Sequence, residues 1–317
     1  MKIIILTEGG KNIGFGHIAR CHSLYQAFRE NGYSPELIIF SDNSIEGLLD
    51  HAQYQIVNWL KKPHIVFQLL KSATMAIIDS YLAKKSLYYK ISEIMNGRVV
   101  AIDDYNRVEY PAGIVLNPSL YGNRLHYSKR EGVTYLLGKD YILLRRAFWN
   151  IPKKHINRKI RNILITFGGT NRHRLINTVT HFLKEEFNCN FYTIGPQKNI
   201  HDAHGTLNLM LKADICISGG GQTIHELARV GVPTIGICFA ENQRYSLQEW
   251  RDRGFIEYIG WHKNKKLLSD LSKGIKKLKS HKKRCQQHKI GKALVDGKGA
   301  MRLLKVLANK RWIGNIG

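Results

Sequence analysis

Cysteine, acidic side chains and long apolar runs are all scarce in this sequence of 317 residues. The five cysteines are odd in number and widely spaced, without a C-x-x-C pair, which argues against a zinc ribbon and against a disulfide framework. No apolar run reaches the ~18 residues that a membrane-spanning helix needs. The apolar run that opens the chain is too short for a signal peptide. We therefore expect a reduced, cytoplasmic protein in which Cys216 and Cys238, which lie within apolar runs, are small core residues.

The shortage of acidic residues leaves the chain strongly basic. Its 24 Asp and Glu face 49 Lys and Arg, a formal net charge of +25. Twelve of the basic residues fall between Lys263 and Lys292, against the single acid Asp270. This 263–292 stretch is compatible with contact to an anionic membrane surface or an anionic substrate, but a solvated helical face is the interpretation we favour. Because no zinc finger, RNP-type motif or recognition helix accompanies it, nucleic acid is not expected as a partner.

Short apolar runs alternate with helix-patterned segments along the whole chain, as in α/β proteins with parallel sheets and crossover helices. An amphipathic helix is predicted over Gly16–Asn31 and a tail helix over Lys292–Leu307. The predicted strands are Lys2–Thr7, Glu36–Phe40, Met75–Ile78, Val99–Asp103, Gly113–Asn117, Asn162–Phe167, Asn190–Ile194, Asp214–Ser218 and Pro233–Cys238.

The strand–helix pattern is interrupted at Ile151–Arg161, where Pro152 stands among five basic residues. We therefore predict two Rossmann-like domains, residues 1–152 and residues 153–317, each close to the usual size of a single domain. The sequence permits the tail helix to pack back on the N-terminal domain.

Two glycines mark the turn after the first strand, in the run Gly14-Phe15-Gly16-His17. Such glycines let the backbone turn sharply and approach a ligand, and the helix N-terminus that follows adds partial positive charge. The run is not a dinucleotide fingerprint, because residue 19 is Ala. His17 is placed at the carboxyl edge of the sheet, where open α/β proteins bind ligands. His17 is either a general base that takes a proton from water or a capping residue. Arg20, one turn further along the helix, is interpreted as a local ion-pair residue.

A second glycine-rich turn follows the strand Asp214–Ser218. Three consecutive glycines at a strand-to-helix junction expose several amides at one point, which suits a pyrophosphate. Glu226, one turn into the next helix, is placed to accept both hydroxyls of a ribose, or it is an ordinary acid that complements the helix dipole. Asn242 and Gln243, past the next strand, are placed to contact a sugar. The residues of the turn and of the helix start are Gly219, Gly220, Gly221, Gln222 and Thr223.

The whole string from Ile217 to Gln243 resembles the nucleotide-sugar signature of the GT-B superfamily, best known from the MurG-type glycosyltransferases. The resemblance implies two Rossmann-like domains with parallel sheets facing across a cleft. It also implies that the glutamate on the helix holds the ribose of UDP and that the glutamine orients the donor sugar.

Further motifs are similar to the PseG-type hydrolase family of pseudaminic acid biosynthesis, in bacterial surface glycan formation. They are Gly14–Arg20, Ile78–Tyr81, Ile102–Asp104, Leu116–Asn117, Phe167–Thr170 and Val295–Arg302. This resemblance implies hydrolysis of UDP-2,4-diacetamido-2,4,6-trideoxy-β-L-altropyranose to UDP and the free sugar, with inversion at C1 and with neither metal nor cofactor.

The same resemblance favours His17 as the base. Tyr81 is a candidate for hydrogen bonding to the water or sugar, and Asp79 for orienting a neighbouring group. Ordinary strand-end capping is the alternative for both. Asn117 is a candidate contact for an acetamido group, and the resemblance adds Gly168 and Gly169 to the substrate-binding residues.

Two other functions stay open at this stage. One is an inverting MurG-like glycosyltransferase that acts on a nonulosonate-type or related nucleotide sugar at the membrane. The other is a non-catalytic module that binds a nucleotide sugar. In each case we expect a monomer with a UDP-sugar as its ligand.

Overall fold

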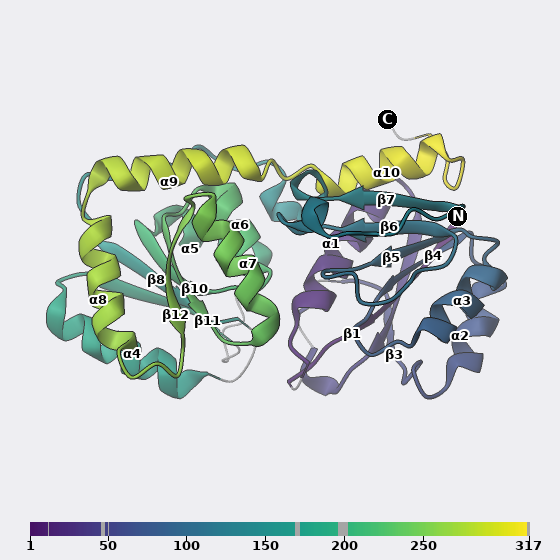
Figure 1. Cartoon of the computed structure of the whole chain (residues 1–317), viewed down its shortest axis with the longest axis horizontal. Helices are drawn as coiled ribbons and strands as arrows, with labels where there is room; N and C mark the ends of the chain where they lie inside the picture. The colour runs from purple at the N-terminus through teal and green to yellow at the C-terminus, as the bar shows by residue number, and fades with distance from the viewer. Residues whose placement is uncertain (12, 46–47, 50, 169–171, 196–201, 316–317) are drawn as a thin grey trace. The chain divides into compact units, whose positions relative to one another are not determined.

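The computed structural model describes every residue except 12, 46–47, 50, 169–171, 196–201 and 316–317. The chain forms two compact units, Met1–Arg146 with Gly297–Gly317, and Ala147–Asp296 (Figure 1). Each unit is built around one parallel β-sheet, so the predicted α/β architecture with two Rossmann-like domains is confirmed. Within the described part of the chain, no helix combines the length and the apolar character that crossing a bilayer requires.

The first unit contains a seven-stranded sheet in the order β3-β2-β1-β4-β5-β6-β7, in which every neighbouring pair is parallel. Its strands are β1 (Lys2–Glu8), β2 (Ser34–Phe40), β3 (Tyr54–Ile56), β4 (Met75–Asp79), β5 (Val99–Ile102), β6 (Gly113–Asn117) and β7 (Val133–Leu137). Its helices are α1 (Gly16–Glu30), α2 (Pro63–Leu70), α3 (Lys85–Ile94) and α10 (Gly299–Asn309). The order reverses between β1 and β4, which makes their carboxyl ends the topological switch point of the sheet.

The second unit contains a five-stranded parallel sheet in the order β12-β11-β10-β8-β9. Its strands are β8 (Asn162–Thr166), β9 (Asn190–Ile194), β10 (Ile215–Gly219), β11 (Thr234–Cys238) and β12 (Ile256–Trp261). Its helices are α4 (His173–Glu186), α5 (Ala203–Lys212), α6 (Thr223–Val230), α7 (Glu241–Asp252), α8 (Leu267–Leu278) and α9 (His281–Leu294). Here the switch point lies between β8 and β10.

The central strands bury both faces against helices, which is why they are continuous apolar runs in the sequence. All five residues of β4, β6, β10 and β11 are buried, and Cys216 and Cys238 are core residues as predicted. All nine predicted strands are present, with ends that differ by at most two residues.

The tail of the chain differs from its prediction. A helix over Lys292–Leu307 is wrong at its start, because α9 ends at Leu294 and α10 begins only at Gly299. Gly297, with φ near 80°, breaks the helix between them. Helix α10 packs on α1 within the first unit, where a Cβ on Gly299 would lie 2.2 Å from the carbonyl oxygen of Ile142. Only glycine at position 299 allows the start of α10 to lie so close to the backbone at Ile142.

The basic segment Ile151–Arg161, predicted as the domain boundary, is fixed to the second unit. The Lys154 ammonium is buried and donates to three carbonyls at the end of α5, those of Met210, Leu211 and Ala213, at 3.2, 2.7 and 2.5 Å. The buried Arg284 of α9 donates to carbonyls further along the same segment. The division between the units therefore falls a few residues earlier, between Arg146 and Ala147.

Candidate active site

The loop between β1 and α1 aims the first turn of α1 at the switch point of the first sheet. Gly10 and Gly14 exchange both backbone hydrogen bonds, at 3.1 and 2.7 Å, and so close the loop on itself. A Cβ on Gly9 would lie 2.3 Å from Cδ1 of Ile18, which shows how closely the helix approaches this loop. Gly14 has φ near 90°, a conformation that favours glycine. Helix α1 then begins at Gly16, as predicted, and places His17 in its first turn.

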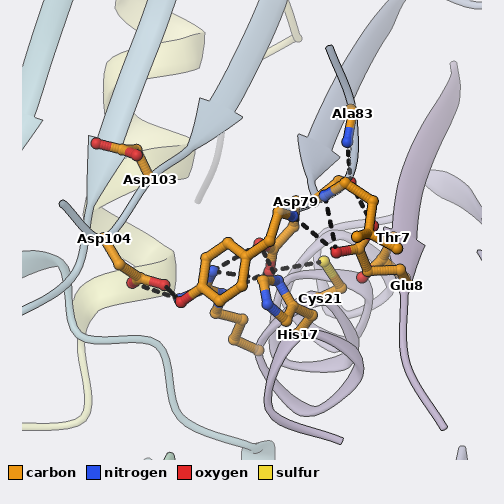
Figure 2. Close-up of polar contacts among 12 residues, drawn as sticks. Thr7, Glu8, His17, Cys21, Asp79, Ala83, Asp103 and Asp104 are labelled. Atoms are coloured by element: carbon orange, nitrogen blue, oxygen red, sulfur yellow. Dashed lines mark hydrogen bonds and ion pairs between the residues drawn. The ribbon is translucent and has the colours of Figure 1, made fainter. Parts of the chain in front are cut away.

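His17 meets the carboxyl end of β4 in a buried hydrogen bond. Its Nδ1 lies 2.6 Å from Oδ1 of Asp79, which is fully buried, and only 6% of His17 is exposed (Figure 2). Burial alone would raise the pKa of Asp79, but the charges and hydrogen bonds of Arg20 and His17 hold it below its ordinary value. An ionised carboxylate only accepts hydrogen bonds, so Nδ1 carries the hydrogen and the lone pair of Nε2 is left to take a proton.

Arg20 joins two carboxylates from two strand ends. Its Nε and Nη2 donate to the two oxygens of Asp79 at 2.5 and 2.6 Å, and its Nη1 donates to Asp104 at 2.6 Å. Burial opposes the charge of Arg20, but the charges of Asp104 and Asp79 outweigh it and raise the pKa of the guanidinium. The interpretation of Arg20 as a local ion-pair residue is therefore wrong, because its partners follow β4 and β5.

Tyr81 contacts both His17 and the ion-pair network. Its ring contacts the His17 imidazole edge-on at 4.2 Å between centroids, and its hydroxyl donates to Asp104. Burial and the charge of Asp104 raise the pKa of Tyr81 well above its ordinary value, so the phenol stays protonated. Because that hydrogen is committed to Asp104, the phenolic oxygen can act toward a ligand only as an acceptor.

Glu8, which sequence reasoning missed, fixes the loop that carries Tyr81. It is fully buried at the end of β1 and accepts hydrogen bonds from the amides of Tyr81 (2.7 Å) and Leu82 (3.2 Å) and from the hydroxyl of Ser80. The local signal for Glu8 is an acid that directly ends a buried apolar strand, whereas its hydrogen-bond partners depend on the sheet order.

Asn117, at the end of β6, is fully buried and already hydrogen-bonded within the protein. Its Oδ1 accepts from the amide and hydroxyl of Ser119 at 3.0 and 2.5 Å, and its Nδ2 donates to the hydroxyl of Tyr127 at 3.0 Å. These contacts order the loop after β6. The predicted contact of Asn117 with an acetamido group stays a prediction.

The second glycine-rich turn lies at the switch point of the second sheet. Gly219 ends β10, and a Cβ there would lie 3.1 Å from the Phe239 ring and 3.8 Å from the carbonyl oxygen of Phe167 after β8. A Cβ on Gly220 would lie 2.7 Å from Leu247, so side chains of α7 back the turn and require glycine there. Gly168, with φ near 80°, follows β8, whereas Gly169 lies outside the described residues.

The polar residues predicted around this turn are only partly brought together. Gln243 borders the turn, with its Cβ 3.1 Å from the Cβ position of Gly220, and its Oε1 accepts from the amide of Phe239 at 3.2 Å. Glu226 is buried in the first turn of α6, which Gln222 and Thr223 open. Asn242 is exposed in the first turn of α7. The contact of Asn242 with a sugar and the contact of Glu226 with a ribose both stay predictions.

Arg172 is a second residue that sequence reasoning missed. Its guanidinium lies 4.2 Å from the centroid of the Phe239 ring, which also contacts Phe167 and His262 at 4.9 and 5.1 Å. Arg172 directly precedes α4, so it stands at the same edge of the sheet as the glycine turn. Burial lowers its pKa, but a guanidinium remains charged at neutral pH and adds positive charge to this edge.

Residues 183–303 match the glycosyltransferase family 28 C-terminal domain. The solved structure of Acinetobacter baumannii MurG covers 98% of this chain and 100% of its own length, with a TM-score of 0.67 at 12% identity. The chain has the GT-B fold. A structure of S. aureus MnaA with UDP is similar over 100% of this chain and 99% of its own, with a TM-score of 0.64 at 12% identity.

Two curated relatives are similar in sequence. The spore coat polysaccharide biosynthesis protein SpsG of Bacillus subtilis is 23% identical over 97% of this chain and 98% of its own length. A Helicobacter pylori protein is 24% identical over 81% of this chain. It is named pseudaminic acid cytidylyltransferase and UDP-2,4-diacetamido-2,4,6-trideoxy-beta-L-altropyranose hydrolase, and the match covers 48% of its length.

Proposed function

We propose that this protein hydrolyses a UDP-activated 2,4-diacetamido-2,4,6-trideoxyhexose to UDP and the free sugar, with His17 as the general base. The observation that carries the proposal is the buried His17–Asp79 pair, with 2.6 Å between Nδ1 and Oδ1. The likeness to the Helicobacter pylori protein, whose name includes such a hydrolase, supports the choice of substrate.

In the proposed reaction, the oxygen of a water molecule attacks C1 of the sugar while Nε2 of His17 takes one of its protons. The bond between C1 and the pyrophosphate oxygen breaks, and the electron pair leaves with UDP. Because UDP departs as a stabilised anion, the step needs a base far more than an acid. Attack from the face opposite the leaving group inverts the configuration at C1. The ionised Asp79 stabilises the imidazolium that forms.

The second unit is proposed to hold UDP. Amides at the Gly219–Gly221 turn and the N-terminus of α6 suit the pyrophosphate, and the cation of Arg172 stands at the same edge of the sheet. Glu226 is proposed to accept the ribose hydroxyls, and Asn242 and Gln243 to contact the sugar. The charge that develops on the leaving group is then balanced by groups that are fixed before the reaction starts.

The test is incubation of the protein with the UDP-sugar in water, with phosphorus NMR to follow UDP and proton NMR to identify the first anomer formed. We expect UDP release without any acceptor and an inverted anomer. His17→Gln should lower kcat by about 10²–10⁴-fold, the usual contribution of a general base. Turnover that survives intact in this variant would remove His17 from the mechanism.

An inverting glycosyltransferase is the second candidate, favoured by the match to the family 28 domain and the fold shared with MurG. It predicts that UDP is released only when a sugar acceptor is added. Strict dependence on an acceptor in the same assay would therefore replace the hydrolase with this function.

A further inference from the structure

A row of three aromatic rings leads from the proposed base toward solvent. The His17 and Tyr81 rings are 4.2 Å apart between centroids, and the Tyr81 and Tyr105 rings are 5.4 Å apart. Exposure rises along the row, from 6% for His17 to 43% for Tyr105. The outermost ring is therefore partly open to solvent and separated from the proposed base by a single ring, that of Tyr81.

The loop that carries Tyr105 is held in place by its neighbours. The buried Asp103 accepts hydrogen bonds from the amides of Asn106 and Arg107, at 2.6 and 3.2 Å. Asn106 adopts a left-handed conformation, with φ near 58°, and its Nδ2 donates to the carbonyl of His126 at 3.0 Å. These bonds fix the backbone on the C-terminal side of Tyr105. A ring on an ordered loop loses little entropy when a ligand stacks on it.

Leu82 adds a second exposed apolar side chain on the neighbouring loop. It directly follows Tyr81, its amide donates to Glu8 at 3.2 Å, and 51% of the residue is exposed. An exposed aromatic ring and an exposed leucine follow the ends of the neighbouring strands β5 and β4, and together they favour a ligand with an apolar surface. A hydroxyl pressed against such groups would lose water without gaining a hydrogen bond, whereas a methyl gains from burial.

We propose that Tyr105 is a specificity-determining residue whose exposed ring stacks on the apolar face of the pyranose. The ring then selects sugars that carry a methyl group, rather than a hydroxymethyl group, at C5. This inference rests on the proposed function, because it requires the sugar to lie beside His17 for attack at C1. The reacting carbon is then near the first ring of the row, and the far side of the pyranose extends toward the third.

The experiment compares the wild type with Tyr105→Ala and with the matched control Tyr105→Phe, which keeps the ring. The substrates are the UDP-6-deoxy sugar and its 6-hydroxy counterpart. We expect Tyr105→Ala to raise KM for the deoxy sugar about five- to tenfold and to reduce the preference over the hydroxy sugar by a similar factor. Its kcat should stay within about twofold, and Tyr105→Phe should behave as the wild type.

Binding of the intact UDP-sugar and of UDP alone, measured by calorimetry, separates this inference from the proposed function. Tyr105→Ala should weaken the UDP-sugar and leave UDP unchanged, whether or not the wild type turns the sugar over. An unchanged KM and affinity in Tyr105→Ala would overturn the stacking. An equal loss in Tyr105→Phe would also overturn it, because the hydroxyl and not the ring face would then bind the sugar. Absent turnover with intact sugar binding would refute the hydrolase alone.

Discussion

Asp79→Asn is the substitution that tests the proposed base most directly. An amide can donate to Nδ1 of His17, which moves the ring hydrogen to Nε2 and removes the lone pair that would accept a proton. We expect kcat to fall by about 10²–10⁴-fold. Arg20 loses a bidentate partner at 2.5 and 2.6 Å but keeps Asp104. The loss of stability should therefore be about 3 kcal/mol, the low end for a broken buried ion pair.

That loss corresponds to a fall in Tm of about 6–12 °C in a domain of this size, so rates must be compared well below the Tm of the variant. Asp214→Asn is the matched control. Asp214 is also buried and accepts three hydrogen bonds, from Asn157, Arg161 and Asn162, but these contacts all lie within the second unit. The control should lose stability and keep its rate. A rate in Asp79→Asn within tenfold of the wild type would refute the tautomer argument.

Two further predictions concern stability. Burial lowers the pKa of Lys154 to about 8, so between pH 8 and 10.5 the unfolded chain binds the proton of Lys154 more tightly than the folded protein does. The unfolding free energy of the wild type should therefore rise over this range, relative to that of Lys154→Met, by up to about 3 kcal/mol. Urea titrations of both proteins check this, and a difference that does not change with pH would contradict it. Gly299→Ala should lower Tm by several degrees in a thermal scan, because the new Cβ would lie 2.2 Å from the Ile142 carbonyl oxygen. Among the described residues, a Cβ on Gly195 would meet only Ile176, at 3.8 Å, so Gly195→Ala should not lower Tm.

The sequence predicted the central strands well and three outer strands not at all. The missed strands are β3, β7 and β12, which all lie at the edges of their sheets. Every residue of β3 is exposed, and most of β7 and β12 is only half-buried. A strand that is not buried on both faces needs no continuous apolar run, so its pattern is weak in the sequence.

The candidate site was predicted residue by residue but not as a network. His17 was singled out by a glycine turn at a strand end, and Asp79 and Tyr81 by the motif Ile78–Tyr81, which resembles the PseG-type family. The contacts of Arg20 depend on β4 lying beside both β1 and β5, and this sheet order cannot be derived from local patterns. Glu8 was missed for the same reason, since its partners follow β4. Side chains that join distant strand ends become visible only once the topology is known.

The charge balance of the network explains why an arginine stands beside the proposed base. Asp79 and Asp104 together carry two negative charges and Arg20 one positive charge, so the three side chains leave one negative charge beside the His17 ring. In the proposed reaction His17 takes a proton from water, and the charges of these four side chains then sum to zero, which favours the imidazolium as the transition state forms. Arg20 thus cancels one of the two carboxylate charges and leaves the other to stabilise the imidazolium.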